Sequence, residues 1–180
     1  MRRLLIFTLI IFASVLQSCD ERISPRQIIP EEVKPLTNTE LLTANPWQYN
    51  EVKLKGGSVT KTAFSRISNP PVQLSSDYGK ATITYKADGT GENNLKGSIE
   101  KIKWKFLSNE SQIEVTRENG TKLLYNVDLL TKDNFNQNNV TTKASLNNND
   151  DAYWISYVTN LGFPNNITEF SNVFKLIPVK

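Results

Sequence analysis

The chain has 180 residues, of which 38% are hydrophobic and 22% are charged, enough apolar material for the core of one domain and too little polarity for wholesale disorder. Its formal charge of +3 is close to neutral, which argues against nucleic-acid binding through a clustered basic surface. It has no histidine and a single cysteine, so it lacks the commonest general base, the commonest transition-metal ligand and any intramolecular disulfide.

The amino-terminal segment has the order of a signal peptide. Arg2 and Arg3 precede an apolar run over residues 4–16, which is shorter than the ~20 residues that a membrane-spanning helix needs. The run ends in Leu16-Gln17-Ser18-Cys19, which resembles the lipobox of bacterial lipoproteins. The resemblance implies that residues 1–18 are removed as a lipoprotein signal peptide. It also implies that acyl chains such as palmitate on Cys19 attach the mature protein to a membrane.

Residues 19–38 are predicted to form a flexible tether. Pro25, Pro30 and Pro35 favour an extended spacer. The acidic pair Asp20-Glu21 is similar to the export signal that sends many Bacteroidota lipoproteins to the cell surface, and a merely solvated start of the tether is the alternative. We therefore expect an outer-membrane lipoprotein of the cell envelope, with the periplasmic and surface-facing leaflets both left open.

Residues 39–180 are predicted to form one β-rich domain that begins with a short helix. Thr39-Glu40-Leu41-Leu42 looks like the start of that helix, with Asn38 or Thr39 as its cap and Pro46 as its stop. Trp47 then begins a strand that runs to about Leu54.

The clearest strand pattern lies between residues 101 and 130. Apolar and polar side chains alternate there in three consecutive segments, which predicts an antiparallel meander. Parity sets the register, because residues that face one core must lie opposite one another. Phe106 opposite Ile113 and Trp104 opposite Val115 leave Asn109-Glu110 as a two-residue loop. Val115 opposite Leu123 requires the three-residue loop 118–120, with Gly120 in the left-handed conformation.

Further strands are expected on both sides of the meander. Ala81, Ile83 and Tyr85 alternate with threonines before a turn at 87–91, and Phe135 marks one more short strand. Residues 153–158 and 173–179 also predict strands, with apolar residues on both faces. About eight strands separated by turn signals indicate an all-β antiparallel barrel or sandwich.

The chain resembles the lipocalin-like lipoproteins of Bacteroidota. The resemblance covers roughly residues 38–135. It is carried by Leu41-Leu42 before Trp47, by the turn Tyr85-Lys86-Ala87-Asp88-Gly89-Thr90-Gly91, by Trp104-Lys105-Phe106, and by the segment 125–131. It implies a lipocalin-like barrel of about eight strands, with a short helix before it, that binds a small apolar or amphipathic molecule without catalysing a reaction.

Trp47, Tyr85, Trp104 and Tyr125 are the candidate ligand-binding residues, because aromatic side chains at strand period face the inside of a barrel. The same pattern is also typical of plain core, and both interpretations stay open. No serine elbow or phosphate loop is present, so we expect no enzyme, cofactor or metal site. The alternative function is an accessory module that docks on an outer-membrane complex or a glycan through its outer face. The oligomeric state is left open.

Overall fold

The computed structural model describes residues 34–67, 78–95, 97–146 and 150–180. The chain divides into two compact units, Met1–Pro35 and Leu36–Lys180, and all described helices and strands belong to the second. The predicted signal peptide, Cys19 and the tether up to residue 33 lie outside the described residues. In chain order the elements are α2 (Asn38–Thr43), β1 (Trp47–Gly56), β2 (Val59–Ser65), β3 (Thr82–Tyr85), β4 (Thr90–Leu95), β5 (Ser98–Leu107), β6 (Gln112–Arg117), β7 (Lys122–Leu130), β8 (Phe135–Thr142), the 3-10 turn η1 (Ala144–Leu146), α3 (Asp151–Asn160) and β9 (Glu169–Pro178).

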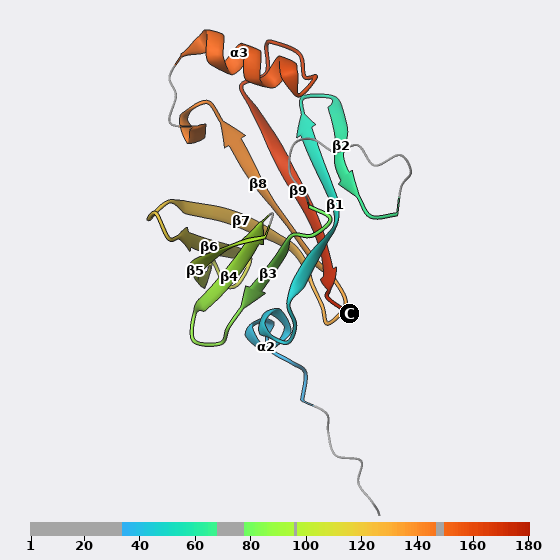
Figure 1. Cartoon of the computed structure of the whole chain (residues 1–180), viewed down its shortest axis with the longest axis vertical. Helices are drawn as coiled ribbons and strands as arrows, with labels where there is room; N and C mark the ends of the chain where they lie inside the picture. The colour runs from blue at the N-terminus through green and yellow to red at the C-terminus, as the bar shows by residue number, and fades with distance from the viewer. Residues whose placement is uncertain (1–33, 68–77, 96, 147–149) are drawn as a thin grey trace, which may run out of the picture. The chain divides into compact units, whose positions relative to one another are not determined.

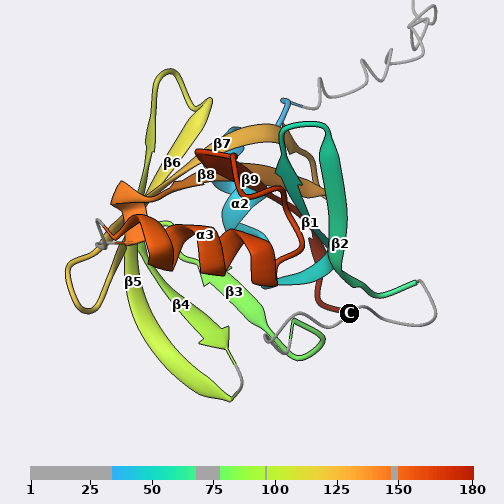
Figure 2. The same cartoon turned by 90° about the horizontal axis from the view of Figure 1, so that it is seen from above.

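Eight of the strands close into an antiparallel barrel, so the predicted barrel architecture is confirmed (Figure 1). Around the ring they follow the order β1, β3, β4, β5, β6, β7, β8, β9, and β9 pairs back onto β1. Strand β2 stays outside this ring as the hairpin partner of β1. Helix α2 lies at one end of the barrel and α3 at the other, where it crosses above the strands in Figure 2.

The ring closes unevenly around β1. One edge of β1 pairs with β9 from Trp47 to Lys55. The other edge is divided, because Glu51–Gly56 pairs with β2 and the start of the strand pairs with β3. The seam between β1 and β3 rests on two residue pairs, Trp47 with Ile83 and Gln48 with Thr82. Closure of the ring therefore depends on the first two residues of β1, Trp47 and Gln48.

Strands β5, β6 and β7 form the predicted meander in the predicted register. Trp104 lies opposite Val115 and Phe106 opposite Ile113. In the turn between β5 and β6, Asn109 and Glu110 both have positive φ, as a two-residue hairpin loop requires. The parity argument alone was enough to place these strands.

The β3–β4 and β6–β7 hairpins use the same three-residue loop, Ala87–Gly89 in the first and Glu118–Gly120 in the second. In each loop the glycine is left-handed, with φ of +81° at Gly89 and +83° at Gly120. The Asp or Asn before the glycine accepts a hydrogen bond from the threonine amide after it, at 2.9 and 3.0 Å. The predicted bulged turn at Gly120 is confirmed, and Val115 lies opposite Leu123.

The cap predicted for the first helix, Asn38 or Thr39, is wrong by one or two residues. Helix α2 begins at Asn38, and Thr37 is its N-cap. The Thr37 hydroxyl accepts from the Glu40 amide at 3.2 Å, and the Glu40 carboxylate accepts from the Thr37 amide at 2.7 Å. This reciprocal capping box makes Thr37 a better cap than Asn38 or Thr39, because it satisfies two orphan amides at once.

The strand predicted at residues 153–158 is also wrong, because this segment belongs to helix α3. Asp150 caps the helix, and its side chain accepts from the Ala152 amide. Trp154 and Val158 are buried four residues apart, so the apolar residues follow the helical period rather than the alternation of a strand. The indole N–H of Trp154 donates to the Ile167 carbonyl at 2.7 Å and fastens α3 to the chain that leads into β9.

Candidate functional site in the barrel interior

Three of the four predicted ligand-binding residues meet in one aromatic layer at the α2 end of the barrel. Trp47 and Tyr85 both lie against Phe135, with ring centroids 5.6 and 6.1 Å apart, and Tyr85 lies against Trp104 at 5.5 Å. All four side chains are at most 8% exposed. The rings of this floor layer, defined as Trp47, Tyr85, Trp104 and Phe135, pack edge-to-face at this end of the interior.

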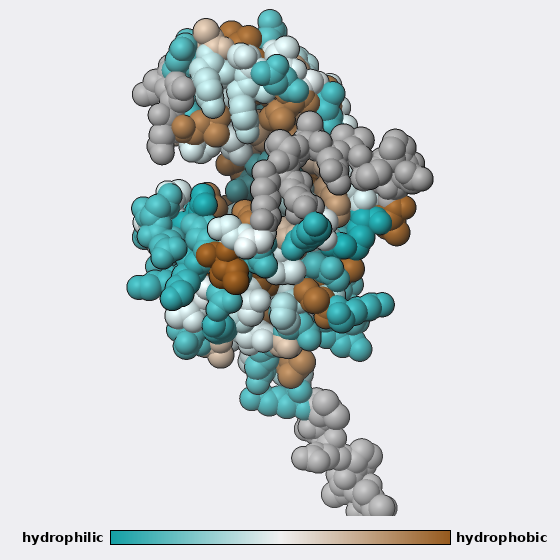
Figure 3. Space-filling view, viewed as in Figure 1, coloured by the Kyte–Doolittle hydropathy of each residue, from teal (hydrophilic) through white to brown (hydrophobic). Residues whose placement is uncertain are grey.

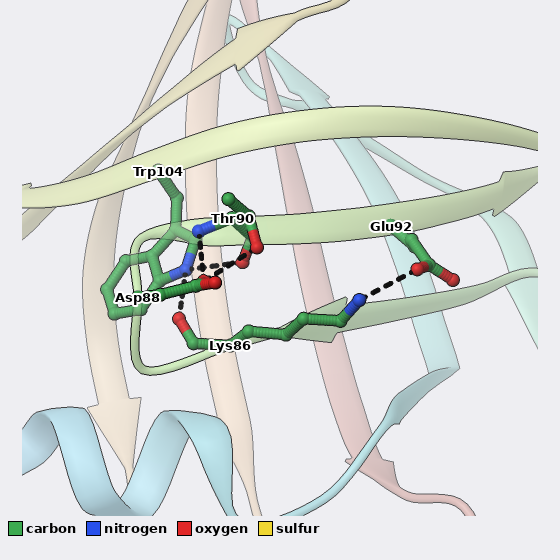
Figure 4. A network of polar contacts seen from close by, with 5 residues as sticks. All are labelled: Lys86, Asp88, Thr90, Glu92 and Trp104. Atoms are coloured by element: carbon green, nitrogen blue, oxygen red, sulfur yellow. Dashed lines mark hydrogen bonds and ion pairs between the residues drawn. The ribbon is translucent and has the colours of Figure 1, made fainter.

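Both indole N–H groups of the floor layer are satisfied by backbone carbonyls. Trp47 donates to the Leu42 carbonyl at 2.8 Å, which ties helix α2 to the start of β1. Trp104 donates to the carbonyls of Lys86 and Thr90, each at 3.0 Å, and lies beneath the β3–β4 turn (Figure 4). The two tryptophans therefore hold the end of α2 and the β3–β4 turn by hydrogen bonds. The Tyr85 hydroxyl is the remaining polar group of this layer.

The fourth predicted residue, Tyr125, lies in a second layer further from α2. Its ring lies 6.1 Å from Phe174, which in turn lies 5.8 Å from Tyr49. Tyr49 also contacts Tyr78, at 5.1 Å. Tyr49 was not among the predicted site residues, although it lies two positions after Trp47 and shares its face.

Burial keeps the hydroxyls of these tyrosines protonated. Burial raises the pKa of Tyr125 to about 12, and the neighbouring Tyr78 adds to the effect. Burial, and then the proximity of Tyr125, raise the pKa values of Tyr49 and Tyr85 well above their usual range. The interior therefore presents neutral hydroxyl groups that can both donate and accept hydrogen bonds.

Four side-chain atoms are fully buried and lack a hydrogen-bond partner among the described residues, namely Tyr85 Oη, Asn93 Oδ1, Asn94 Oδ1 and Gln137 Oε1. Tyr85 and Gln137 belong to the aromatic part of the interior, whereas Asn93 and Asn94 lie on β4. Gln137 is 2% exposed and lies on β8 opposite Val127 of β7 and Phe174 of β9. A buried polar atom without a partner costs about 1–3 kcal/mol, and native proteins keep few of them. Gln137 was missed because glutamine in a strand usually faces water, although its spacing of two from Phe135 placed it on the inner face.

The charged groups on the inner face neutralise each other. Arg117 lies opposite Ile102, and its Nε donates to both carboxylate oxygens of Glu100, at 2.9 and 3.1 Å. This hydrogen bond raises the pKa of Arg117 above its usual range. On β8 and β9, the side-chain amide of Asn172 donates to Asn139 and Thr141 at 3.0 and 2.8 Å. The end of the interior away from α2 is thus polar, and the charges of Glu100 and Arg117 there balance each other.

The barrel wall divides between β7 and β8. The two strands pair from Asn126 with Asn138 to Leu130 with Phe135, whereas Lys122–Tyr125 pairs with β6 and Asn139–Thr142 with β9. Figure 1 shows β7 turning away while β8 runs on toward α3. In the same view the surface is hollowed between the part that carries α3 and the part that carries the β6–β7 hairpin (Figure 3). Tyr125 lies where the two strands separate.

A separate groove of about 570 Å³ lies outside the ring, over β4, β5 and β6. Its walls are mostly outward-facing side chains, among them Lys86, Glu92, Lys101 and Lys103, and they also include Ile102 and Arg117 of the inner face. Lys86 and Glu92 form an exposed ion pair at 2.9 Å, which raises the pKa of the lysine and lowers that of the glutamate (Figure 4). None of the four predicted ligand-binding residues lines this groove.

No protein-family model matches the sequence, and no curated protein matches it. The fold therefore defines the class, which is a closed eight-stranded antiparallel β-barrel with an aromatic interior. In the described ranges, no group of three or more histidine, cysteine or carboxylate side chains is placed to hold a metal ion. None of the helices in the described part of the chain combines the length and the apolar character that a membrane crossing needs.

Proposed function

We propose that this protein is a lipid-anchored, non-enzymatic binding protein whose lipocalin-like barrel holds a small amphipathic molecule. The observation that carries the proposal is the pair of buried, unpartnered polar atoms, Tyr85 Oη and Gln137 Oε1, between aromatic walls. Ligand sites are mostly apolar with a few convergent polar groups, and a barrel of about eight strands has room for one small ligand.

The division of the wall between β7 and β8 supports the proposal. A ligand needs a way into a closed barrel. Past Asn126 and Asn138, the backbone groups of β7 and β8 no longer pair with each other, so the wall is not continuous there. Tyr125 lies at this point on the inner face. The floor layer closes the other end, so the second layer around Tyr125 is the part of the interior that a ligand would reach.

Binding without catalysis fits the chemistry of the interior. The titratable groups that the described residues bring together there are protonated tyrosines and the Glu100–Arg117 pair. A hydroxyl with a strongly raised pKa stays protonated, which makes it a poor base and a poor nucleophile at neutral pH. The Glu100 carboxylate accepts hydrogen bonds from Arg117 with both of its oxygens.

The place of action proposed is the outer membrane, with lipid on Cys19 as the anchor. Replacing Cys19 by Ser should remove the mass of the acyl chains, because serine offers no thiol for a thioether, and should leave residues 1–18 on the chain, which intact-mass spectrometry detects. Protease shaving of intact cells would then separate the two leaflets, because a surface-facing domain is cut and a periplasmic one is protected. The same acyl mass in the wild-type and Cys19→Ser proteins would contradict the anchor.

Native mass spectrometry of the whole mature protein, extracted from its own envelope, tests the binding function. The covalent lipid stays on the chain after denaturation, whereas a molecule held in the barrel leaves. A mass that is lost on denaturation supports the proposal and gives the size of the ligand. The same mass before and after denaturation, at protein concentrations that retain weak complexes, would count against it.

The groove outside the ring favours a second candidate function, docking on an envelope complex or a glycan. Lys101 and Lys103 line this groove on the face that points away from the aromatic interior. Replacing both by Glu should abolish recovery of a specific partner and leave any barrel ligand in place. If the double variant loses the barrel ligand and keeps the partner, this second function is wrong.

A further inference from the structure

Four polar side chains of the aromatic interior, Tyr49, Tyr85, Tyr125 and Gln137, are called here the hydroxyl–amide cluster. The four residues come from four strands, β1, β3, β7 and β8. Gln137 lies opposite Val127, two residues along the inner face of β7 from Tyr125. It also lies two residues along β8 from Phe135, whose ring contacts Tyr85. The cluster therefore spans the boundary between the floor layer and the second layer.

The charges that face the cluster do not favour an ionic ligand. Tyr49, Tyr85 and Tyr125 influence one another there, and the raised pKa of each hydroxyl keeps it neutral near pH 7. Arg117 also acts on Tyr125, but both carboxylate oxygens of Glu100 already accept from its Nε. A carboxylate or an ammonium group moved into this interior would lose its water and find no free countercharge, which is costly.

The atoms that lack partners demand a group that both donates and accepts. Gln137 Oε1 can accept only, whereas Tyr85 Oη can donate one hydrogen bond and accept others. A ketone or an ester offers acceptors alone and would leave Gln137 Oε1 unsatisfied. A hydroxyl group offers a donor and acceptors in one atom and serves both kinds of partner.

We infer that the ligand of the barrel is an uncharged amphipathic alcohol, whose hydroxyl group hydrogen-bonds to the hydroxyl–amide cluster while its apolar part lies against the aromatic walls. The inference rests on the proposed function and names the ligand class of that same site. A fatty acid and an alkyl amine can carry the same apolar part as the alcohol, so only the head group distinguishes the three kinds of ligand.

The test compares three probes that share one alkyl chain, namely decanol, decanoate and decylammonium. The full mature chain carrying Cys19→Ser is used, so that no detergent or lipid competes. Each probe displaces the neutral fluorophore N-phenyl-1-naphthylamine at neutral pH. Decanol should displace it at about tenfold lower concentration than either ion, since one well-placed hydrogen bond and the avoided burial of a charge together amount to at least that factor.

Two variants show whether the cluster is responsible. Tyr85→Phe removes the unpartnered hydroxyl and should raise the concentration of decanol needed for displacement by about tenfold. That concentration should then be close to those of decanoate and decylammonium. Because that hydroxyl has no described partner, the urea midpoint of Tyr85→Phe should stay unchanged or rise, which a merely structural role would not allow. Tyr153→Phe is the matched control, because Tyr153 is 46% exposed on α3, and it should alter neither quantity.

The outcomes separate the two levels of the argument. Equal displacement by all three probes, or stronger displacement by decanoate or decylammonium, overturns the alcohol while leaving a barrel that binds amphipathic molecules. A lowered urea midpoint for Tyr85→Phe overturns the role of the cluster, because the hydroxyl then supports the fold. Failure of the fluorophore and of all three probes to bind overturns the proposed function itself.

Discussion

Replacing Trp47 by Phe tests whether the seam between β1 and β3 controls closure of the barrel. Trp47 is fully buried, donates to the Leu42 carbonyl at 2.8 Å, and lies opposite Ile83 in one of the two residue pairs of the seam. The phenyl ring keeps the contact with Phe135 but loses the hydrogen bond and part of the ring volume. The variant therefore changes the support of the seam without introducing a polar group.

The expected loss in the free energy of unfolding is about 3 kcal/mol. About 1–2 kcal/mol of this comes from the lost hydrogen bond and the buried Leu42 carbonyl left without its partner. A further ~1–2 kcal/mol comes from the smaller ring, because the cavity that it leaves closes incompletely. Urea denaturation followed by far-ultraviolet circular dichroism measures the loss.

Trp154→Phe is the matched control. Trp154 is 5% exposed and its indole also donates to a backbone carbonyl, that of Ile167 at 2.7 Å, but it is part of α3, at the end of the barrel away from the seam. Both variants should lose similar stability. In hydrogen exchange, Trp47→Phe should speed exchange in α2, β3 and the start of β1, whereas Trp154→Phe should speed it in residues 151–170. A uniform increase in Trp47→Phe, or a loss below about 1 kcal/mol, would refute the special role of the seam.

Two further predictions concern the close contact of β3 with β4 and the buried tyrosines. A Cβ added at Gly91 would lie 2.4 Å from the Thr84 carbonyl oxygen, so Gly91→Ala should lower the free energy of unfolding by about 2–4 kcal/mol. Gly97→Ala, which meets no atom within 4 Å, should lose only the ~1 kcal/mol of its left-handed φ; equal losses in urea would refute the steric reasoning. The folded pKa of Tyr125 is about 12 against about 10 in the unfolded chain, so the folded state holds this proton more tightly. Stability should then be complete below pH 10 and fall by about 2 kcal/mol between pH 10 and 12, with a shallower fall for Tyr125→Phe; parallel curves for the two proteins would contradict the assignment.

The parts of the fold that sequence could predict are those that local periodicity determines. The register of β5, β6 and β7 followed from the parity of residues such as Trp104 and Val115, and the turn at Gly120 followed from that register. Helix α3 could have been predicted as well, because Trp154 and Val158 are four residues apart, but aromatic residues on both faces of a short segment also suit a strand.

The parts that could not be predicted depend on contacts between distant segments. Nothing local to β2 shows that it pairs with β1 outside the ring, because the same edge of β1 serves both β2 and β3. The candidate site shows the same limit. The strand period predicted that Trp47, Tyr85 and Trp104 face the interior. It could not predict that the Tyr85 hydroxyl lacks a hydrogen-bond partner, because this depends on how the distant strands pack together.

The three tryptophan side chains make this domain suitable for site-specific fluorescence measurements. All three indole N–H groups bind backbone carbonyls, and each marks a different place: Trp47 the α2 end, Trp104 the β3–β4 turn, and Trp154 the α3 end. Variants that retain one tryptophan at a time would give three separate fluorescence signals from a single small barrel. Opening at either end, or loosening of the hairpin, could then be followed as a local emission change rather than as an average over the whole molecule.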